Sequence, residues 1–211
     1  MRIAFILTIA SLVTGCASLR QPEAMIPQPT NDWRAVATAD DRGRVRDWRS
    51  TFVAAVAAAR AAGHGAEIAR EGVLLEPDAA LGGGSIPDGD FRCRITKVGA
   101  QSEGLLDYVA YPDFLCRVDT RPGSLGQRRN FTKVTGSQRA MGVIFPDGAM
   151  RDIFLGTMVL GDEQRALQYG VDETRDVAGL IERIGPARWR MVLPEPHFES
   201  RLDVIDLVPV R

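Results

Sequence analysis

The sequence contains side chains able to act as acids, bases or nucleophiles, but none stands in a known catalytic motif. Its two histidines, His64 and His197, lie far apart along the chain. In an extended segment Glu195, His197 and Glu199 would share one side and could contact a divalent ion, yet no second histidine is near in sequence. The chain has no Gly-x-Ser-x-Gly elbow, phosphate-binding glycine loop, dinucleotide fingerprint or His-Glu-x-x-His sequence. We therefore predict no catalytic residue, no metal site and no cofactor.

Paired carboxylates leave one catalytic alternative open. Asp162 with Glu163, and Asp203 with Asp206, are the residue types that glycan hydrolases use in pairs. Adjacent acids in a turn, however, usually point apart into solvent. A hydrolase with unrecognised catalytic residues is therefore the alternative to a non-catalytic protein.

Arginine is the residue type that most suggests binding. The chain has 24 arginines and 2 lysines, and a guanidinium group binds carboxylates and phosphates through two parallel hydrogen bonds. Arg139 is the first candidate, because Ser137 and Gln138 add neutral hydrogen-bonding groups beside it. Arg188 and Arg190, on either side of a tryptophan, are the next. The alternative is that these arginines point outward and pair with surface acids.

Two cysteines predict a structural disulfide. Cys93 and Cys116 each follow a phenylalanine by two positions, so in extended chain each cysteine shares a face with an aromatic side chain. A metal site is unfavoured because no histidine is near, and a catalytic thiol would more plausibly be unpaired and exposed. A disulfide closing a loop of about 24 residues stabilises a protein by roughly 3 kcal/mol.

The N-terminus predicts export and lipidation. Arg2 precedes an apolar run, Ile3–Val13, which is shorter than the roughly 20 residues of a membrane-spanning helix and is typical of a secretory signal peptide. The run ends in Val13-Thr14-Gly15-Cys16, which resembles the lipobox of bacterial lipoproteins, where the cysteine is acylated. We predict a lipoprotein signal peptide over residues 1–15 and a lipid on Cys16. The alternative is an ordinary export signal with a chance cysteine.

Residues 16–31 are predicted to form a lipid-anchored tether, because they contain three prolines and few apolar side chains. Ala17, which follows the cysteine, is not acidic, and in this class of signals that implies the outer membrane. Several acyl chains anchor a protein stably where one chain is marginal. The expected location is therefore the outer membrane of a Gram-negative bacterium, with the folded part facing the periplasm.

Residues 32–85 are predicted to be a helical segment. Thr38 can cap a helix that ends at Gly63, and a shorter helix follows around Ala66–Glu71. Apolar residues recur every three or four positions in the longer helix, so one face must pack on something apolar. This stripe consists of Val45, Trp48, Phe52, Val56 and Ala59.

Residues 86–211 are predicted to be an antiparallel β domain, because the apolar pattern changes to a period of two between turn sequences. The fold class is then α+β, with the helical segment against the outside or across an open end of a β-barrel or sandwich. Strand Met150–Leu160 is apolar on both faces and should be covered on both. The nine expected strands are Phe91–Val98, Tyr108–Tyr111, Phe114–Asp119, Asn130–Thr135, Arg139–Phe145, Met150–Leu160, Val177–Ile184, Arg188–Leu193 and Leu202–Val208.

From Trp33 to Val210 the chain resembles an uncharacterised bacterial cell-envelope lipoprotein family, a domain of unknown function. The resemblance brings no activity with it. A further likeness to lipocalins and to protease inhibitors that are small disulfide-bearing periplasmic barrels rests on architecture alone. The motifs that carry the family resemblance include Gly63-His64, Ile68-Ala69-Arg70-Glu71-Gly72, Phe91-Arg92-Cys93-Arg94, Tyr108-Val109-Ala110-Tyr111-Pro112, Thr135-Gly136-Ser137-Gln138-Arg139 and Arg188-Trp189-Arg190.

Taken with the location, these features predict a non-catalytic binding or interaction module of the envelope. Its partner would be a periplasmic protein or an anionic envelope component, besides the membrane that holds the lipid. The formal net charge of −1 makes nucleic acid an unfavoured partner. An open barrel with an apolar cavity would favour a small ligand, whereas a filled barrel with an exposed apolar patch would favour a protein partner. A hydrolase or a protease-inhibitor-like barrel is the alternative.

Overall fold

The computed structural model describes residues 30–123 and 126–210, so the predicted signal peptide, Cys16 and most of the predicted tether lie outside the described residues. Helices occupy the first part of this range. They are α1 (Trp33–Val36), α2 (Ala39–Ala59), a π-helical turn (Arg60–His64), α3 (Gly65–Glu71) and a 3₁₀ turn (Gly72–Leu75). No helix in this part of the chain is long and apolar enough to cross a membrane.

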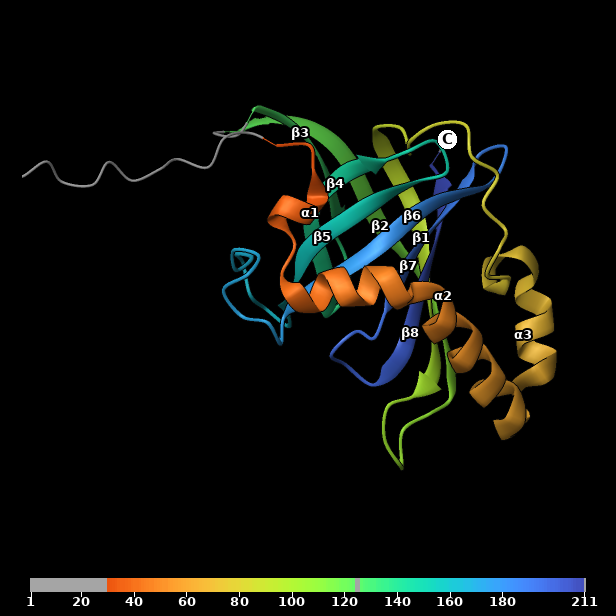
Figure 1. Ribbon diagram of the computed structural model, residues 1–211. Helices are drawn as coiled ribbons and strands as arrows, with labels where there is room; N and C mark the ends of the chain where they lie inside the picture. The colour runs from red at the N-terminus through yellow and green to blue at the C-terminus, as the bar shows by residue number, and fades with distance from the viewer. Residues whose placement is uncertain (1–29, 124–125, 211) are drawn as a thin grey trace, which may run out of the picture.

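The rest of the described chain forms a closed antiparallel barrel (Figure 1). Each strand pairs with the next along the chain, and β8 closes the barrel on β1. The predicted α+β class is confirmed, and the β domain is a barrel rather than a sandwich. The strands are β1 (Gly89–Ala100), β2 (Tyr108–Gly123), β3 (Gly126–Lys133), β4 (Gln138–Asp147), β5 (Arg151–Leu160), β6 (Asp176–Gly185), β7 (Arg188–Pro194) and β8 (Ser200–Pro209).

The prediction of nine strands was wrong by one, because Tyr108–Tyr111 and Phe114–Asp119 belong to the single strand β2. Pro112 lies between these two predicted strands, and proline has no N–H to give to a strand ladder. Along β1 only Ile95 lies between Arg94, paired with Asp113, and Thr96, paired with Ala110. Pro112 therefore sits in a β-bulge, where one residue is left out of the ladder and proline is tolerated.

Helix α2 covers one wall of the barrel and makes an outer core. Thr38 caps it as predicted, since its hydroxyl accepts a hydrogen bond from the Asp41 amide at 3.2 Å. The apolar stripe packs against β1, β6, β7 and β8, with Trp48 only partly buried. The regular α-helix ends at Ala59, and Gly63 in the following π-helical turn has a left-handed φ of 101°. A glycine meets no steric penalty in that conformation.

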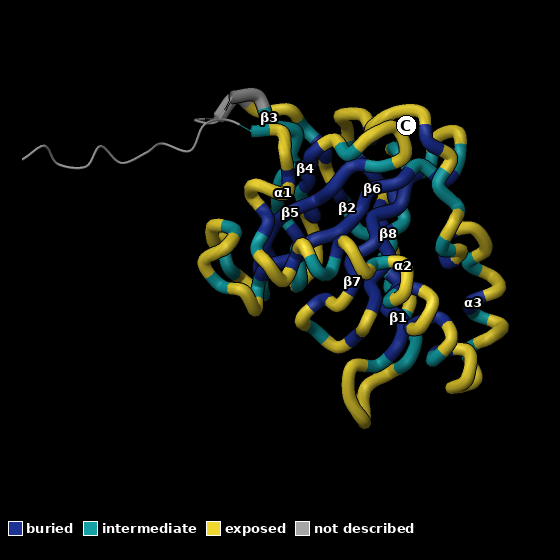
Figure 2. Tube along the Cα trace, in the orientation of Figure 1, coloured by how far each residue is buried: buried dark blue, intermediate teal, exposed yellow. Residues whose placement is uncertain are grey.

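A second core fills the inside of the barrel. Phe91, Phe131, Phe154 and Trp189 meet there, and both cysteines are fully buried among them. The predicted disulfide is confirmed: Cys93 and Cys116 are bonded across β1 and β2, with their Cα atoms 5.8 Å apart. Strand β5 contributes to both cores, as its two apolar faces predicted. Figure 2 shows the buried positions following the strands, whereas the turns and the outward sides of the helices are exposed.

Candidate functional site

Side chains of the described residues occupy the lumen of the barrel. Two phenylalanine rings, Phe131 and Phe154, meet edge to face at 5.6 Å in its middle. Trp189 and Phe91 form a second edge-to-face pair at 6.2 Å. Ile86, in the segment before β1, is fully buried and belongs to the same core. The groove described next lies on the outside of the barrel.

A groove of about 560 Å³ lies on the wall that α2 leaves uncovered. Residues of β2 to β5 form its floor, and most of them face outward, although the ring of Phe131 packs inside the barrel. Helix α1 and the β5–β6 loop, residues 161–175, form its walls. In Figure 1, α1 and this loop flank that part of the barrel. The lining consists of Val36, Arg121, Arg128, Asn130, Phe131, Thr132, Met141, Gly142, Val143, Leu155, Thr157, Ala166, Leu167, Gln168 and Tyr169. We call this feature the outer-wall groove.

The α1 wall of the groove is fixed to the barrel by Trp33. Its ring is buried in the outer core, and its indole N–H donates to Asp147 Oδ1 at 3.0 Å. Asp32 caps α1 by accepting a hydrogen bond from the Arg34 amide at 3.0 Å. Val36 is consequently held at the edge of the groove with 41% of its surface exposed.

The loop wall is fixed by a buried tyrosine–aspartate contact. Tyr169 donates its hydroxyl proton to Asp41 Oδ2 at 2.5 Å and accepts from the Thr38 amide at 3.1 Å. Burial and the hydrogen bond to Asp41 raise the pKa of Tyr169 above its ordinary value. The other carboxylate oxygen of Asp41 accepts from Arg44 at 2.7 Å. Since both oxygens of Asp41 have partners, this buried acid holds the groove wall in place.

A second ion pair closes the same loop. Arg175 donates to both oxygens of Glu163, at 2.9 and 3.0 Å, and the Leu160 amide donates to Glu163 Oε2 at 2.9 Å. These contacts lower the pKa of Glu163 to about 2. Asp176 accepts two hydrogen bonds from the Gly170 amide, at 3.1 and 3.0 Å, although burial raises the pKa of its carboxyl. The acids beside the groove are thus engaged in shaping the loop.

The floor of the groove contains a hydroxyl group without a partner. Thr157, on the outward face of β5, is only 3% exposed. Its Oγ1 forms no hydrogen bond with any residue in 30–123 and 126–210. A buried polar group without a partner costs about 1–3 kcal/mol, so such groups are uncommon away from functional sites. Thr157 is the only described residue of the lining with a buried, unpartnered side-chain atom; Asp119 Oδ1 and Trp189 Nε1 are further such atoms outside the lining.

The predicted binding residues Ser137, Gln138 and Arg139 lie in the β3–β4 turn and the start of β4, away from the groove lining. Arg139 donates to the carbonyl oxygens of Gly136, Gly161 and Glu163, at 2.9, 2.6 and 2.7 Å. Its guanidinium group joins the turns that precede β4 and follow β5. That these residues bind an anionic ligand stays a prediction.

The structure does not bring the other two predicted arginines to Arg139, because they lie on β7. Arg188 donates to both oxygens of Asp206, at 2.8 and 3.0 Å. Arg190 is 0% exposed and donates to Glu182 Oε2 at 3.0 and 2.8 Å. It also donates to the carbonyl oxygens of Leu74, Glu76 and Pro77, so it ties the segment after α3 to the barrel wall.

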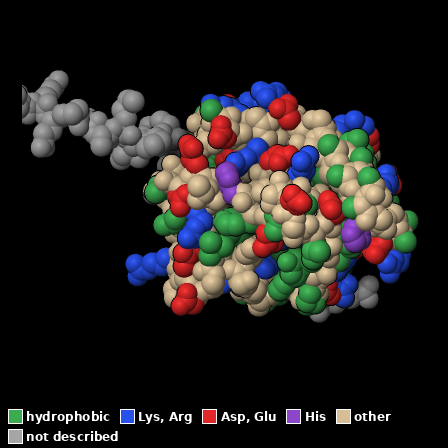
Figure 3. Space-filling model, turned by 90° about the horizontal axis from the view of Figure 1, so that it is seen from below, with side chains coloured by type: hydrophobic (Ala, Val, Ile, Leu, Met, Phe, Trp, Pro, Cys, Tyr) green, Lys and Arg blue, Asp and Glu red, His purple; other side chains and the backbone are tan. Residues whose placement is uncertain are grey.

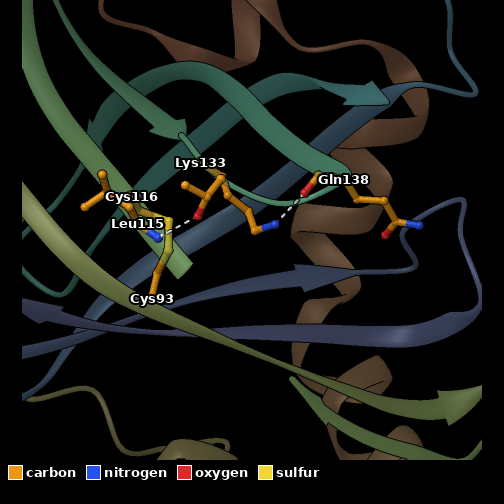
Figure 4. The surroundings of a disulfide bond; sticks show 6 residues. Cys93, Leu115, Cys116, Lys133 and Gln138 are labelled. Atoms are coloured by element: carbon orange, nitrogen blue, oxygen red, sulfur yellow. Dashed lines mark hydrogen bonds between the residues drawn. A yellow bond between two sulfur atoms is a disulfide. The ribbon is translucent and has the colours of Figure 1, made fainter. Parts of the chain in front are cut away.

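Both lysines of the chain point into the barrel, which sequence reasoning did not foresee. Lys97 pairs with Asp203 at 3.0 Å. Lys133 is 3% exposed and donates to the carbonyl oxygen of Gln138 at 2.7 Å, close to the disulfide (Figure 4). Burial, and then the positive charges of Arg139 and Lys97, lower the pKa of Lys133 to about 8. A lysine is able to lose its charge there, whereas an arginine is not.

The two histidines contact different side chains at separate places on the surface. His64 stacks on Tyr108 with ring centroids 5.6 Å apart. His197 accepts a hydrogen bond from Arg44 at 2.5 Å, and burial and that guanidinium group lower its pKa. Within residues 30–123 and 126–210 no group of three or more His, Cys, Asp or Glu side chains could hold a metal ion. Figure 3 shows acidic and basic side chains interspersed over the face seen from below.

Fold and site together define a class of protein: a filled, disulfide-bonded eight-stranded barrel with a helix on one wall and a groove in another. The family model described as a domain of unknown function, DUF4893, matches residues 33–207. The chain belongs to this family. No curated protein and no solved structure matches it.

Proposed function

We propose that this chain is a lipid-anchored, non-catalytic protein of the Gram-negative cell envelope, and that it binds a partner protein in the outer-wall groove. Export and lipidation at Cys16 are supported by the N-terminal sequence, since its short apolar run ends in a lipobox-like segment. The anchor would hold the barrel beside the membrane, where envelope proteins come within reach.

One observation carries the binding role: side chains fill the lumen, while an apolar groove of about 560 Å³ lies on the outer wall. Met141, Val143, Leu155 and Leu167 give the groove its apolar surface. Exposed apolar surface of this kind typically marks a contact with another protein. The lining also offers neutral hydrogen-bonding groups, which suit a peptide chain with its regular amide N–H and carbonyl groups.

Site-specific crosslinking in cells tests the groove as the working surface. A photo-crosslinking amino acid replaces Val36 or Leu167, which are 41% and 42% exposed, and a matched control replaces Val53 on α2, which is 45% exposed. We expect one envelope protein to be crosslinked from both groove positions and not from the control. Filling the groove with Thr132→Trp should abolish that product while the circular dichroism spectrum is kept. Equal products from all three positions would refute the proposal.

Membrane fractionation tests the anchor separately. The Cys16→Ser variant should move from the membrane fraction to the soluble periplasmic fraction, because the acyl chains supply the membrane affinity. A Cys93→Ser and Cys116→Ser double variant controls for the loss of any cysteine. If the Cys16 variant still fractionates with membranes, the proposed lipid anchor is wrong.

A further inference from the structure

Two arginines stand directly opposite each other at the edge of the outer-wall groove. Arg121 on β2 and Arg128 on β3 are register partners, and both line the groove. Like charges in direct cross-strand register destabilise a sheet. The pairing therefore has a cost that a bound anion would remove.

The partners of the two guanidinium groups leave this positive charge only partly balanced. Arg121 pairs with Asp119, with nitrogen–oxygen distances of 2.9 and 2.5 Å. Arg128 donates to the neutral amide oxygen of Asn31 at 3.0 Å and lies 5.8 Å from the ring centre of Phe145. Within residues 30–123 and 126–210 Arg128 forms no ion pair, and the groove lining contains no aspartate or glutamate. The groove is thus electrostatically complementary to an anion.

Resting on the proposed function, we infer that the partner segment carries a carboxylate side chain that binds between Arg121 and Arg128. Apolar side chains beside this carboxylate then cover the floor towards Thr157. A guanidinium group recognises a carboxylate through two charge-assisted hydrogen bonds, which fixes orientation as well as affinity.

The buried hydroxyl of Thr157 favours a protein segment over an anionic lipid. An alkyl chain lying on the floor would leave this hydroxyl without a partner, at a cost of about 1–3 kcal/mol. A peptide brings amide N–H and carbonyl groups that can pair with this hydroxyl once the Thr157 side chain turns towards the groove. The same argument extends to Asn130, Thr132 and Gln168, the neutral polar residues of the lining.

Selection from a random peptide library displayed on phage tests this inference with the purified full chain. A double variant, Arg121→Gln with Arg128→Gln, is selected in parallel. Arg92→Gln is the matched control, since Arg92 and Arg121 are 60% and 61% exposed and Arg92 lies on β1 away from the groove. We expect peptides that bind the wild type to share an acidic residue next to apolar ones.

A Glu→Gln change in the best peptide should weaken binding to the wild type by at least about tenfold and leave binding to the double variant unchanged. The inference would be overturned if the selected peptides lacked an acidic residue. It would also be overturned if they bound the wild type and the double variant equally well. Arginine-dependent binding of phosphatidylglycerol vesicles without any peptide binding would overturn it too.

The two proposals fail in different ways. If the crosslinks from Val36 and Leu167 persist in the Arg121 and Arg128 double variant, the groove binds a partner but the carboxylate inference is wrong. If the wild type gives no groove-dependent crosslink, the proposed function itself is wrong.

Discussion

Replacing Thr157 by valine should stabilise the free protein and weaken its interaction. The two side chains have nearly the same shape, and Thr157 is 3% exposed with no hydrogen-bond partner for its hydroxyl. Removing an unsatisfied buried hydroxyl recovers about 1–2 kcal/mol of its desolvation cost. For a protein of this size we expect Tm to rise by about 3–6 °C.

Differential scanning calorimetry of the wild type and two threonine-to-valine variants measures this effect. Thr38→Val is the control with the opposite sign, because the Thr38 hydroxyl caps α2 by accepting from the Asp41 amide. Losing that cap should lower the free energy of unfolding by about 1 kcal/mol. In cells, Thr157→Val should also reduce the crosslink formed from Val36.

A Thr157→Val variant with an unchanged or lower Tm would refute the reasoning. The hydroxyl would then already be satisfied, for instance by an ordered water molecule, and would indicate no ligand. A variant with a higher Tm but an undiminished crosslink from Val36 would support the desolvation cost of the hydroxyl and contradict its role in binding. Thr157 would remain an energetic cost in the free protein without a role in recognition.

Three other perturbations test the interior. Folding lowers the pKa of Lys133 from 10.5 to about 8. Between pH 8 and 10.5 the unfolded protein therefore holds a proton on Lys133 that the native protein has lost. The free energy of unfolding should rise with pH across this range by up to about 3 kcal/mol. Lys133→Met should remove this rise in urea unfolding. Glu182→Gln should cost about 3–5 kcal/mol because it leaves the buried Arg190 charge uncompensated. Reducing Cys93–Cys116 should add two protons to the intact mass and lower the free energy of unfolding by about 3 kcal/mol.

Each of these expectations has a control or a contradicting outcome. Asp78→Asn breaks the solvent-exposed pair with Arg49, and it should cost far less stability than Glu182→Gln because water screens exposed charges. A similar cost for both acid variants would show that the Glu182 pair is not truly buried. A pH slope that persists in Lys133→Met would place the titrating group elsewhere. Free thiols in the oxidised protein would contradict the disulfide.

Local patterns in the sequence were sufficient for much of the fold. Thr38 caps α2 and Gly63 takes the left-handed conformation in the turn that follows it, because capping and left-handed backbone depend on residues adjacent in the chain. The disulfide followed from two cysteines with the same alternating neighbours. The one error in strand count lies at Pro112, where a single strand was predicted as two. Only the register with β1 shows that the break is a bulge.

The candidate site depended on contacts between residues distant in sequence. Tyr169 holds a groove wall because it reaches Asp41, and Arg121 faces Arg128 because β2 and β3 pair in one particular register. The environment of Thr157 depends on which side of β5 faces outward and on what covers it. No short-range pattern encodes these facts.

The sequence by itself determined the helical and strand segments, the disulfide and the expectation of export, because each rests on side-chain chemistry within a short stretch of chain. The tertiary structure alone decided that side chains fill the barrel and that a groove lies on its outer wall. It also gave the candidate arginine Arg190 a buried, structural position against Glu182. Burial and pairing are properties of packed neighbours, and closure of the barrel selects those neighbours from the whole chain.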